Sequence, residues 1–275
     1  MELYYSQLIS NGHCTLEGDE ASHCMRVMRN KVGDRISVID GSGTLYDCRI
    51  DAASGSRVEC SILASQEGYR KHPYSLTMAV ALTKNMERFE WFAEKATELG
   101  IDRIVPLVGD FSIRKSFNRE RLERIVIGAA KQSLKAYIPR LDDATRVADF
   151  IASCASPSAS HPIAPFNSAH SSSCISPSEE STDNQSVKLI CYCGDSYPKT
   201  FVTDALKAVF IPRDAKVTSC PEIVILIGPE GDFSQAETEA AISAGFHCVT
   251  LGDARLRVET AALLAVSAVN LHSQR

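Results

Sequence analysis

The sequence predicts a two-domain protein in which a small β-rich domain precedes a larger α/β domain. Residues 1 to about 70 hold short strand-like segments separated by glycine-rich turns, whereas short apolar runs alternate with amphipathic stretches from about residue 74. The length of 275 residues suits two domains of the usual ~100–200 residues each. We therefore expect domains at residues 1–72 and 73–275.

The composition is that of an ordinary globular protein. Hydrophobic residues make up 44% of the chain and charged residues 23%, which excludes a wholly disordered chain. Apolar runs fall far short of the ~20 residues of a membrane span, and the first residues lack a secretory signal pattern, so we expect a soluble cytoplasmic protein. The net charge of −5 excludes a globally basic nucleic-acid binder but leaves room for a local basic surface. The ten cysteines lack the spacing of a zinc site, and we expect no bound metal.

The expected strands of the first domain are residues 36–40, 44–50 and 58–63. Gly41-Ser42-Gly43 provides the turn between the first two, and apolar residues alternate with polar ones along 44–50. Short strands joined by such turns favour a small barrel or sandwich.

The second domain begins with two strand–helix repeats. Residues 76–82 and 104–108 are short apolar runs typical of buried strands. Phe89, Phe92 and Ala96 fall on one helical stripe that Gly100 ends, and residues 118–135 have the spacing of a second helix. This alternation favours a mostly parallel sheet.

Residues 153–186 interrupt the alternation. They contain 12 serines and 4 prolines, and burial of so few apolar groups does not offset the entropy of ordering them. We interpret the segment as a mobile insertion without a function, the alternative being a flap that substrate orders. Beyond it we expect strands at 187–193, 223–227 and 247–251, and helices at 200–210, 234–244 and 258–271, the second opened by a Ser234–Glu237 capping box.

Two loops follow buried strands, at residues 228–234 and 252–260. Ligands of open α/β sheets bind beyond the carboxyl ends of strands, and glycines let backbone groups approach a ligand closely. A plain turn is the alternative for Gly-Pro-Glu-Gly at 228–231. Neither loop has a nucleotide-phosphate fingerprint.

The segments around these loops read Leu-Ile-Gly-Pro-Glu-Gly-Asp-Phe-Ser at 226–234 and Leu-Gly-Asp-Ala-Arg-Leu-Arg-Val-Glu-Thr-Ala at 251–261. With Thr83-Lys84, the Ala-Thr-Glu-Leu-Gly at 96–100, Gln132-Ser133 before Pro139, and His23, Arg29 and Asp40-Gly41, they resemble the RsmE family of bacterial 16S ribosomal RNA methyltransferases. The resemblance implies an N-terminal PUA-like β-barrel and a C-terminal SPOUT α/β domain with a deep trefoil knot, an exception to the rule that chains are unknotted.

The resemblance also implies that the knot loops bind S-adenosyl-L-methionine, largely through backbone groups. The positions carried over are Leu226, Gly228, Glu230, Gly231, Leu251, Gly252, Leu256 and Arg257. Packing at strand ends is the alternative for Leu226 and Leu251. The sequence departs from the family pattern at Asp232, where a glycine is usual, and at Lys131, where a glutamate is usual, and Lys135 stands in for an arginine.

The implied reaction is methylation of uridine N3, which needs an exposed or flipped base, loss of the N3 proton and in-line transfer. Arg257 and Glu259 are the candidate catalytic residues. Arg257 either stabilises the developing anion or holds a phosphate. For Glu259 a general base, a group that orients Arg257 and a helix cap all stay open, and Thr260 is interpreted as a helix-start residue.

Two basic clusters are candidate RNA contacts. Between residues 112 and 141, eight basic residues face two glutamates, a net charge of +6 (8 minus 2), and Arg114, Lys131 and Lys135 are the chosen contacts. The second cluster is Arg26, Arg29, Lys31 and Arg35. If both contact phosphates, RNA binding falls steeply with salt, whereas solvated helix faces are the alternative.

We therefore expect an S-adenosylmethionine-dependent uridine-N3 methyltransferase acting on 16S ribosomal RNA in the small subunit, in the form of a homodimer. The apolar helix expected at 258–271 is either dimer surface or core. Another SPOUT RNA methyltransferase, such as a tRNA ribose 2′-O-methyltransferase, is one alternative. A non-catalytic RNA-binding ribosome-assembly protein is the other, and it need not bind the cofactor.

Overall fold

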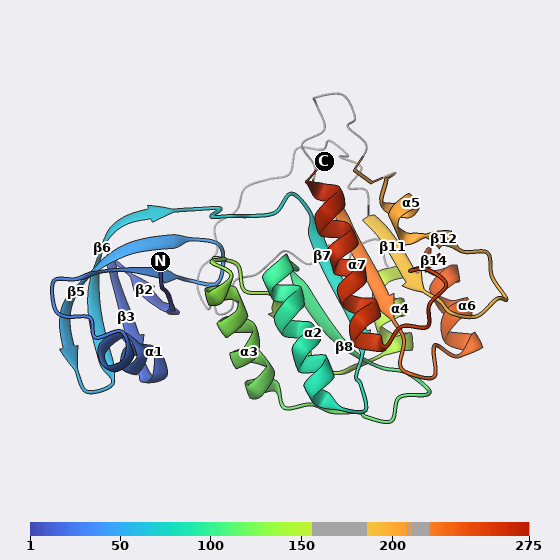
Figure 1. The fold of residues 1–275 in the computed structure, drawn as a ribbon, viewed down its shortest axis with the longest axis horizontal. Coiled ribbons are helices and arrows are strands. Elements are labelled where there is room, and N and C mark those ends of the chain that lie inside the picture. The colour runs from blue at the N-terminus through green and yellow to red at the C-terminus, as the bar shows by residue number, and fades with distance from the viewer. Residues whose placement is uncertain (156–185, 208, 211–219, 275) are drawn as a thin grey trace, which may run out of the picture. The chain divides into compact units, whose positions relative to one another are not determined.

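The computed structural model describes residues 1–155, 186–207, 209–210 and 220–274 (Figure 1). The chain divides into two compact units. The first unit consists of Met1–His72, Ala93–Asp102 and Asn118–Arg140, and the second of Pro73–Phe92, Arg103–Phe117 and Leu141–Arg275. The insertion expected at 153–186 lies outside the described residues except at its ends, where residues 153–155 are helical and residue 186 begins a strand.

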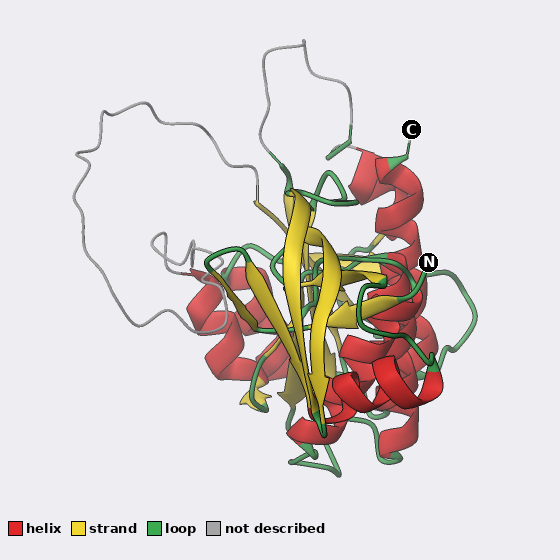
Figure 2. Cartoon of the chain, turned by 90° about the vertical axis from the view of Figure 1, so that its left-hand side faces the viewer, coloured by secondary structure: helices red, strands yellow, loops and turns green. Residues whose placement is uncertain are grey.

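The first unit contains a six-stranded mixed sheet in the order β1-β4-β5-β6-β3-β2. Figure 2 draws the strands of the chain in yellow. Its strands are β1 (Leu3–Tyr5), β2 (Leu8–Ser10), β3 (His13–Glu17), β4 (Arg35–Ile39), β5 (Leu45–Ser54) and β6 (Arg57–Gln66). Strand β1 pairs with β4 in parallel, and the other neighbours are antiparallel. Alternate side chains in the inner parts of these strands, including Val38, Cys48 and Ile50, enter one buried cluster, whereas the last four residues of β5 and of β6 are exposed.

The longer strands of this unit confirm the expected segments, because β4, β5 and β6 cover 36–39, 45–50 and 58–63. The short strands β1 to β3, the helix α1 (Gly18–Ser22) and the π-helical turn η1 (His23–Val27) were not expected. Elements of three to five residues show little hydrophobic period, and β4, of similar length, was recognisable because the Gly41-Ser42-Gly43 turn follows it.

The helix expected at 118–135 is α3 (Arg119–Gln132). Asn118 caps it by accepting a hydrogen bond from the Arg121 amide. The helix ends before Leu134, whose φ of 56° is left-handed and incompatible with a further helical turn.

The second unit contains a parallel sheet in the order β10-β8-β7-β13-β11-β14-β12. Its strands are β7 (Ser75–Ala81), β8 (Arg103–Val108), β10 (Thr145–Arg146), β11 (Ser186–Cys191), β12 (Thr200–Phe201), β13 (Glu222–Ile227) and β14 (His247–Thr250), with the two-residue β9 (Arg140–Leu141) preceding β10. The predicted parallel α/β domain is confirmed.

Helices pack on this sheet as its apolar strands require. These helices are α4 (Val147–Ala155), α5 (Val202–Lys207), α6 (Gln235–Ser243) and α7 (Val258–Ser273). Helix α2 (Met86–Leu99) follows β7, and its residues up to Phe92 belong to the second unit, the rest to the first. Helices α4 and α6 share a buried cluster with Val224 and Leu226, whereas α7 packs on β7 and β13 and also contacts α5 (Figure 1). Strands buried on both faces read as continuous apolar runs, which is why β7 and β13 were recognisable. Helix α4 was not expected, and α5 is shorter than the helix expected at 200–210.

The parallel pairing decides where the loops go. The segments that follow β7, β8, β11, β13 and β14 all leave the same edge of the sheet. Strands β13 and β14 flank β11, so the two loops highlighted by the sequence lie about 10 Å apart, two strand spacings. Within the described ranges, no helix is long and apolar enough to cross a membrane.

Candidate functional site

The loop after β13, residues 228–234, is tied down by side chains. The expected capping box is confirmed: the Ser234 hydroxyl accepts the Glu237 amide, and the Ser234 amide donates to Glu237 Oε2 at 2.8 Å. The second oxygen of Glu237 accepts the Asp110 amide at 3.0 Å. Glu237 is only 6% exposed, so this buried carboxylate joins the loop after β13 to the loop after β8.

Asp232 joins the same loop to a third one. Its backbone has a φ of 66°, a left-handed conformation that explains why a glycine is usual in the family the sequence resembles. An aspartate lacks the conformational freedom of glycine, but its side chain forms two hydrogen bonds here. Oδ2 accepts the Cys193 amide at 3.1 Å, and Oδ1 accepts the Phe233 amide at 2.9 Å. The loop after β11 is thereby held against the loop after β13.

The loop after β14, residues 251–257, is more open. The Thr250 hydroxyl contacts the Gly252 amide and carbonyl at 3.2 and 3.1 Å, and Gly252 has a φ of 123° with open space around it. Leu251 and Leu256 are half-buried, residues 253–255 are exposed, and Arg257 is the exposed N-cap of α7. Arg257 is therefore an exposed cation at the rim of this edge.

Cys193 lies in the loop after β11, where its amide donates to Asp232 of the loop after β13. Burial and the nearby Asp232 carboxylate raise the pKa of its thiol, while Lys199 and Arg255 act in the opposite direction. Asp232 belongs to the loop after β13 and Arg255 to the loop after β14, so charges of both loops act on this thiol.

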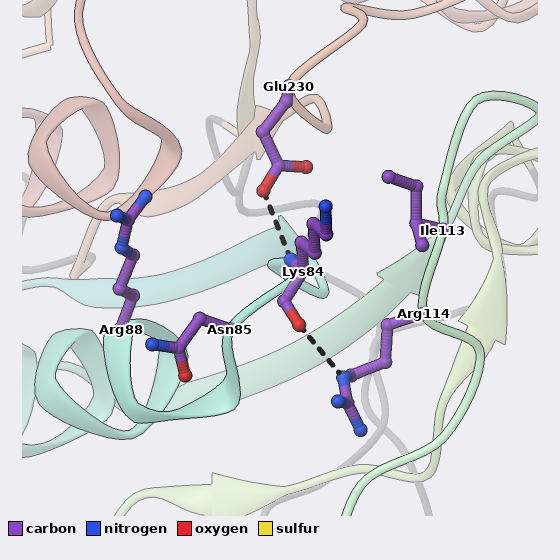
Figure 3. A pocket seen from close by; sticks show the side chains of 6 residues that line it. All are labelled: Lys84, Asn85, Arg88, Ile113, Arg114 and Glu230. Carbon is purple, nitrogen blue, oxygen red and sulfur yellow. Dashed lines mark hydrogen bonds between the residues drawn. The ribbon is translucent and has the colours of Figure 1, made fainter.

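A cavity of about 520 Å³ opens at the same edge of the sheet (Figure 3). It is lined by Lys84, Asn85, Arg88, Ile113, Arg114 and Glu230. The Glu230 carboxylate accepts the Lys84 amide at 3.0 Å, and Arg114 Nε donates to the Lys84 carbonyl at 3.4 Å, as Figure 3 shows. Three cationic side chains face one carboxylate, so the cavity attracts anions.

Glu259 lies against this cavity through Arg88. The Arg88 Nε and Glu259 Oε1 atoms are 3.7 Å apart, and the Glu259 side chain is 11% exposed. Of the roles left open for Glu259, orienting a guanidinium agrees with this geometry, but the guanidinium that it contacts is that of Arg88, whereas the sequence suggested Arg257.

Sequence reasoning missed Lys84, Asn85 and Arg88. A signal was available, because these residues follow the buried run 76–82, and the rule that drew attention to the other loops applies equally to this one. Glu230 is the predicted cofactor residue that the structure brings to this cavity.

The remaining cofactor candidates are a mixture of packing and open positions. Leu226 is fully buried in β13 and belongs to a core cluster, so packing accounts for it. A Cβ atom on Gly231 would lie 3.0 Å from Phe111 Cβ, and one on Gly228 would lie 3.1 Å from the Phe233 ring. Both glycines are therefore closely packed, Gly228 within its own loop and Gly231 against the loop after β8, in addition to any role toward a ligand.

The predicted RNA contacts occupy different settings. Arg114 lies in the second unit, whereas Lys131 and Lys135 lie in the first, so the basic segment is divided. Lys131 Nζ is 2.5 Å from Glu20 Oε1, and burial together with Arg70 lowers the pKa of the half-buried Lys135. Arg26, Arg29 and Lys31 are exposed on and after η1, and Arg35 pairs with Asp47 at 3.6 Å.

Known proteins match this chain over its whole length. A family model described as an RNA methyltransferase domain matches residues 70–270, and one described as an RNA methyltransferase PUA domain matches residues 16–63. Ribosomal RNA small subunit methyltransferase E of Bacillus subtilis is 25% identical over 287 aligned positions, which cover 100% of this chain and 96% of that protein.

Solved structures agree. A probable rRNA-methyltransferase from Porphyromonas gingivalis is 32% identical with a TM-score of 0.77, and the match covers 100% of this chain and 99% of that one. Ribosomal RNA small subunit methyltransferase E from Neisseria gonorrhoeae, solved bound to S-adenosyl methionine, has the same fold with a TM-score of 0.70 at 23% identity, covering 98% and 97%.

Proposed function

The chain belongs to the RNA methyltransferase family, and from this membership we propose that it transfers a methyl group from S-adenosylmethionine to N3 of a uridine in 16S ribosomal RNA. The observation that carries the proposal is the end-to-end match to a ribosomal RNA small subunit methyltransferase together with the convergence of its motif loops at one sheet edge. The choice of N3 follows the family that the motifs resemble.

The loops after β13 and β14 fit the cofactor in chemistry. Half-buried Leu251 and Leu256 offer apolar surface for an adenine, and Gly252 leaves backbone groups open to a ligand. The Glu230 carboxylate is available to hydroxyl or ammonium groups. When bound, the cofactor supplies an electrophilic methyl group on a sulfonium.

The residues of the chain have the remaining work: to hold the uridine out of its stack, to accept the N3 proton and to stabilise the anion left on the base. Arg257 at the rim and Arg88 in the cavity are two cations at this edge suited to the anion or its phosphate. Glu259 holds Arg88, so we propose it as a positioning residue.

Three further proposals accompany this function. The substrate is RNA of the small ribosomal subunit, contacted through Arg26, Arg29 and Lys31 in the first unit and through Arg114 in the second. The active form is a homodimer in the cytoplasm. The SPOUT domain is closed by a trefoil knot.

The test is to incubate the protein with isotopically labelled S-adenosylmethionine and small subunits lacking the modification, and to identify the labelled nucleoside by mass spectrometry. We expect 3-methyluridine. Label in another nucleoside would keep the methyltransferase and overturn its substrate, as for a tRNA ribose methyltransferase. Absence of label, with no cofactor binding by calorimetry, would favour the non-catalytic assembly protein.

A further inference from the structure

The loop after β8, residues 109–114, is rigidly anchored. The Gly109 amide donates to the Ser112 hydroxyl at 2.9 Å, and the Ser112 amide donates to the Gly109 carbonyl at 3.0 Å. Asp110 is bound twice, through its amide to buried Glu237 and through its carboxylate, which accepts the Ser234 hydroxyl at 2.7 Å. The loop is therefore fixed to the start of α6 before any ligand arrives.

Two large apolar side chains of this fixed loop nevertheless face solvent. Phe111 is 55% exposed and Ile113 is 68% exposed. Phe111 lies beside Gly231, because a Cβ on that glycine would be 3.0 Å from Phe111 Cβ, and Ile113 lines the cavity. The anchored backbone presents both side chains at little further entropic cost to a partner that covers them.

Cations line the cavity beside Ile113. Arg114 follows Ile113 in the chain, and Lys84 and Arg88 line the cavity with it (Figure 3). Glu230 lines the cavity, and Glu259 pairs with Arg88 from beside it. These two carboxylates balance two of the three cations, so one positive charge remains. An exposed aromatic ring on the same loop as anion-attracting side chains matches an unstacked nucleotide, whose base stacks on an aromatic ring and whose phosphate binds cations.

We propose that Phe111 and Ile113 form a platform for one unstacked base of the RNA substrate, and that Lys84, Arg88 and Arg114 hold its phosphate. This inference rests on the proposed function and adds to it the place where a single nucleotide is captured. We assign single-stranded RNA to this surface. The tests distinguish it from a protein that covers Phe111 and from the cofactor carboxylate bound in the cavity.

The first test places a fluorophore on the platform. The chain has one tryptophan, the exposed Trp91, so Trp91→Phe combined with Phe111→Trp leaves a single reporter. A short oligouridylate is expected to quench its fluorescence by stacking, and a matched ribose-phosphate oligomer without bases is expected to bind without quenching. Equal effects of the two oligomers, or no quenching by the oligouridylate, would overturn the platform.

A matched control uses Phe201, which is 51% exposed at the far edge of the same sheet. Trp91→Phe combined with Phe201→Trp is expected to show no base-dependent quenching. Quenching of the same size at this position would mean that the signal reports general contact with RNA, which contradicts the proposal.

The second test measures affinity for the oligouridylate. Phe111→Ala is expected to weaken binding by about 10-fold, Phe111→Tyr to restore it, and Phe201→Ala to leave it unchanged. An unchanged affinity for Phe111→Ala, accompanied by a change of oligomeric state in light scattering, would assign the platform to a protein interface and overturn the proposal.

The third test examines the phosphate half. Arg88→Gln is expected to reduce the slope of log affinity against log salt by about 0.7, the value for one phosphate contact on a single strand, while Lys207→Gln on α5 leaves the slope unchanged. If Arg88→Gln instead weakens S-adenosylmethionine binding in calorimetry and leaves the salt slope intact, the cations serve the cofactor and the phosphate site is wrong.

These outcomes separate the inference from the proposed function. Methyl transfer to uridine by the unaltered protein, together with no quenching at position 111, would overturn the nucleotide platform alone. Base-dependent quenching without methyl transfer would support the platform and overturn the proposed reaction. Absence of any RNA binding by the unaltered protein would overturn the platform directly.

Discussion

The loops after β13 and β14 leave the same edge of one sheet, yet they are built differently. In residues 228–234, the side chains of Asp232 and Ser234 form hydrogen bonds that reach the loops after β11 and β8, and the buried Glu237 reinforces the second link. In residues 251–257, Thr250 and Gly252 hold the entry, and residues 253–255 are exposed. The first loop therefore connects neighbouring loops in addition to its candidate role toward a ligand, whereas the middle of the second loop faces solvent.

The comparison separates two costs that a substitution can incur. In the first loop, removing a polar side chain leaves buried backbone groups without partners, so the free energy of unfolding falls. In the second loop, residues 253–255 and Arg257 are exposed, so removal of their side chains should change ligand binding or turnover with little effect on stability. Four substitutions test this division.

Glu237→Ala is expected to have the largest effect. It removes the capping box and leaves the amides of Ser234 and Asp110 without their acceptor, so we expect a loss of about 2–4 kcal/mol in the free energy of unfolding. Urea denaturation measures the loss. A cost below about 1 kcal/mol, the usual value of a cap alone, would show that this carboxylate does not couple the two loops.

Asp232→Ala is expected to cost about 1–2 kcal/mol, because alanine keeps the unfavourable φ of 66° and loses both hydrogen bonds. Asp232→Gly is the matched variant, since glycine relieves the backbone while losing the same bonds. We expect it to be more stable than the alanine variant by about 1 kcal/mol in thermal or urea unfolding. Equal stabilities would mean that the left-handed backbone at this position carries no strain.

Gly252→Ala tests the second loop through its backbone. The position has a φ of 123° with nothing near a Cβ, so strain alone should lower the free energy of unfolding by about 1 kcal/mol. Cofactor affinity, measured by calorimetry, should fall more than stability does. Gly128→Ala in α3 is the control, where the alanine should stabilise the helix by roughly 0.5–1 kcal/mol.

Arg257→Ala is expected to have the smallest effect on stability, within about 0.5 kcal/mol, because its side chain is exposed at the start of α7. The rate of methyl transfer should nevertheless fall sharply if the guanidinium stabilises the reacting anion. Arg255→Ala, two residues earlier and equally exposed, serves as the control. A destabilised Arg257→Ala protein, or unchanged rates, would remove the contrast between the loops.

The sequence predicted the long elements well and the short ones poorly. Strands β7 and β13 are mostly apolar runs because both of their faces are buried. The capping box Ser234–Glu237 predicts the start of α6. By contrast, β1 to β3 have only three to five residues each. Helix α4 was not predicted because its last residues belong to the serine-rich segment.

The candidate site was predicted in part for a related reason. The motif loops at 228–234 and 251–257 are contiguous in sequence, so their glycines and charged residues could be read there. Lys84, Arg88 and Glu230 come from segments that follow two different strands, and they line one cavity because β7 pairs with β13. The charges along the chain also placed Arg114 and Lys131 in one predicted basic cluster, although the fold assigns them to separate units.

The sequence by itself determined the β-rich and α/β domains, the family and the two motif loops, because hydrophobic period, turn chemistry and motif spacing are local properties. Only the tertiary structure decided that Glu259 pairs with Arg88, that Glu237 links two loops, and that Phe111 and Ile113 stay exposed on an anchored loop. These contacts join residues far apart in the chain. The pairing order of the strands, which no local pattern encodes, brings them together.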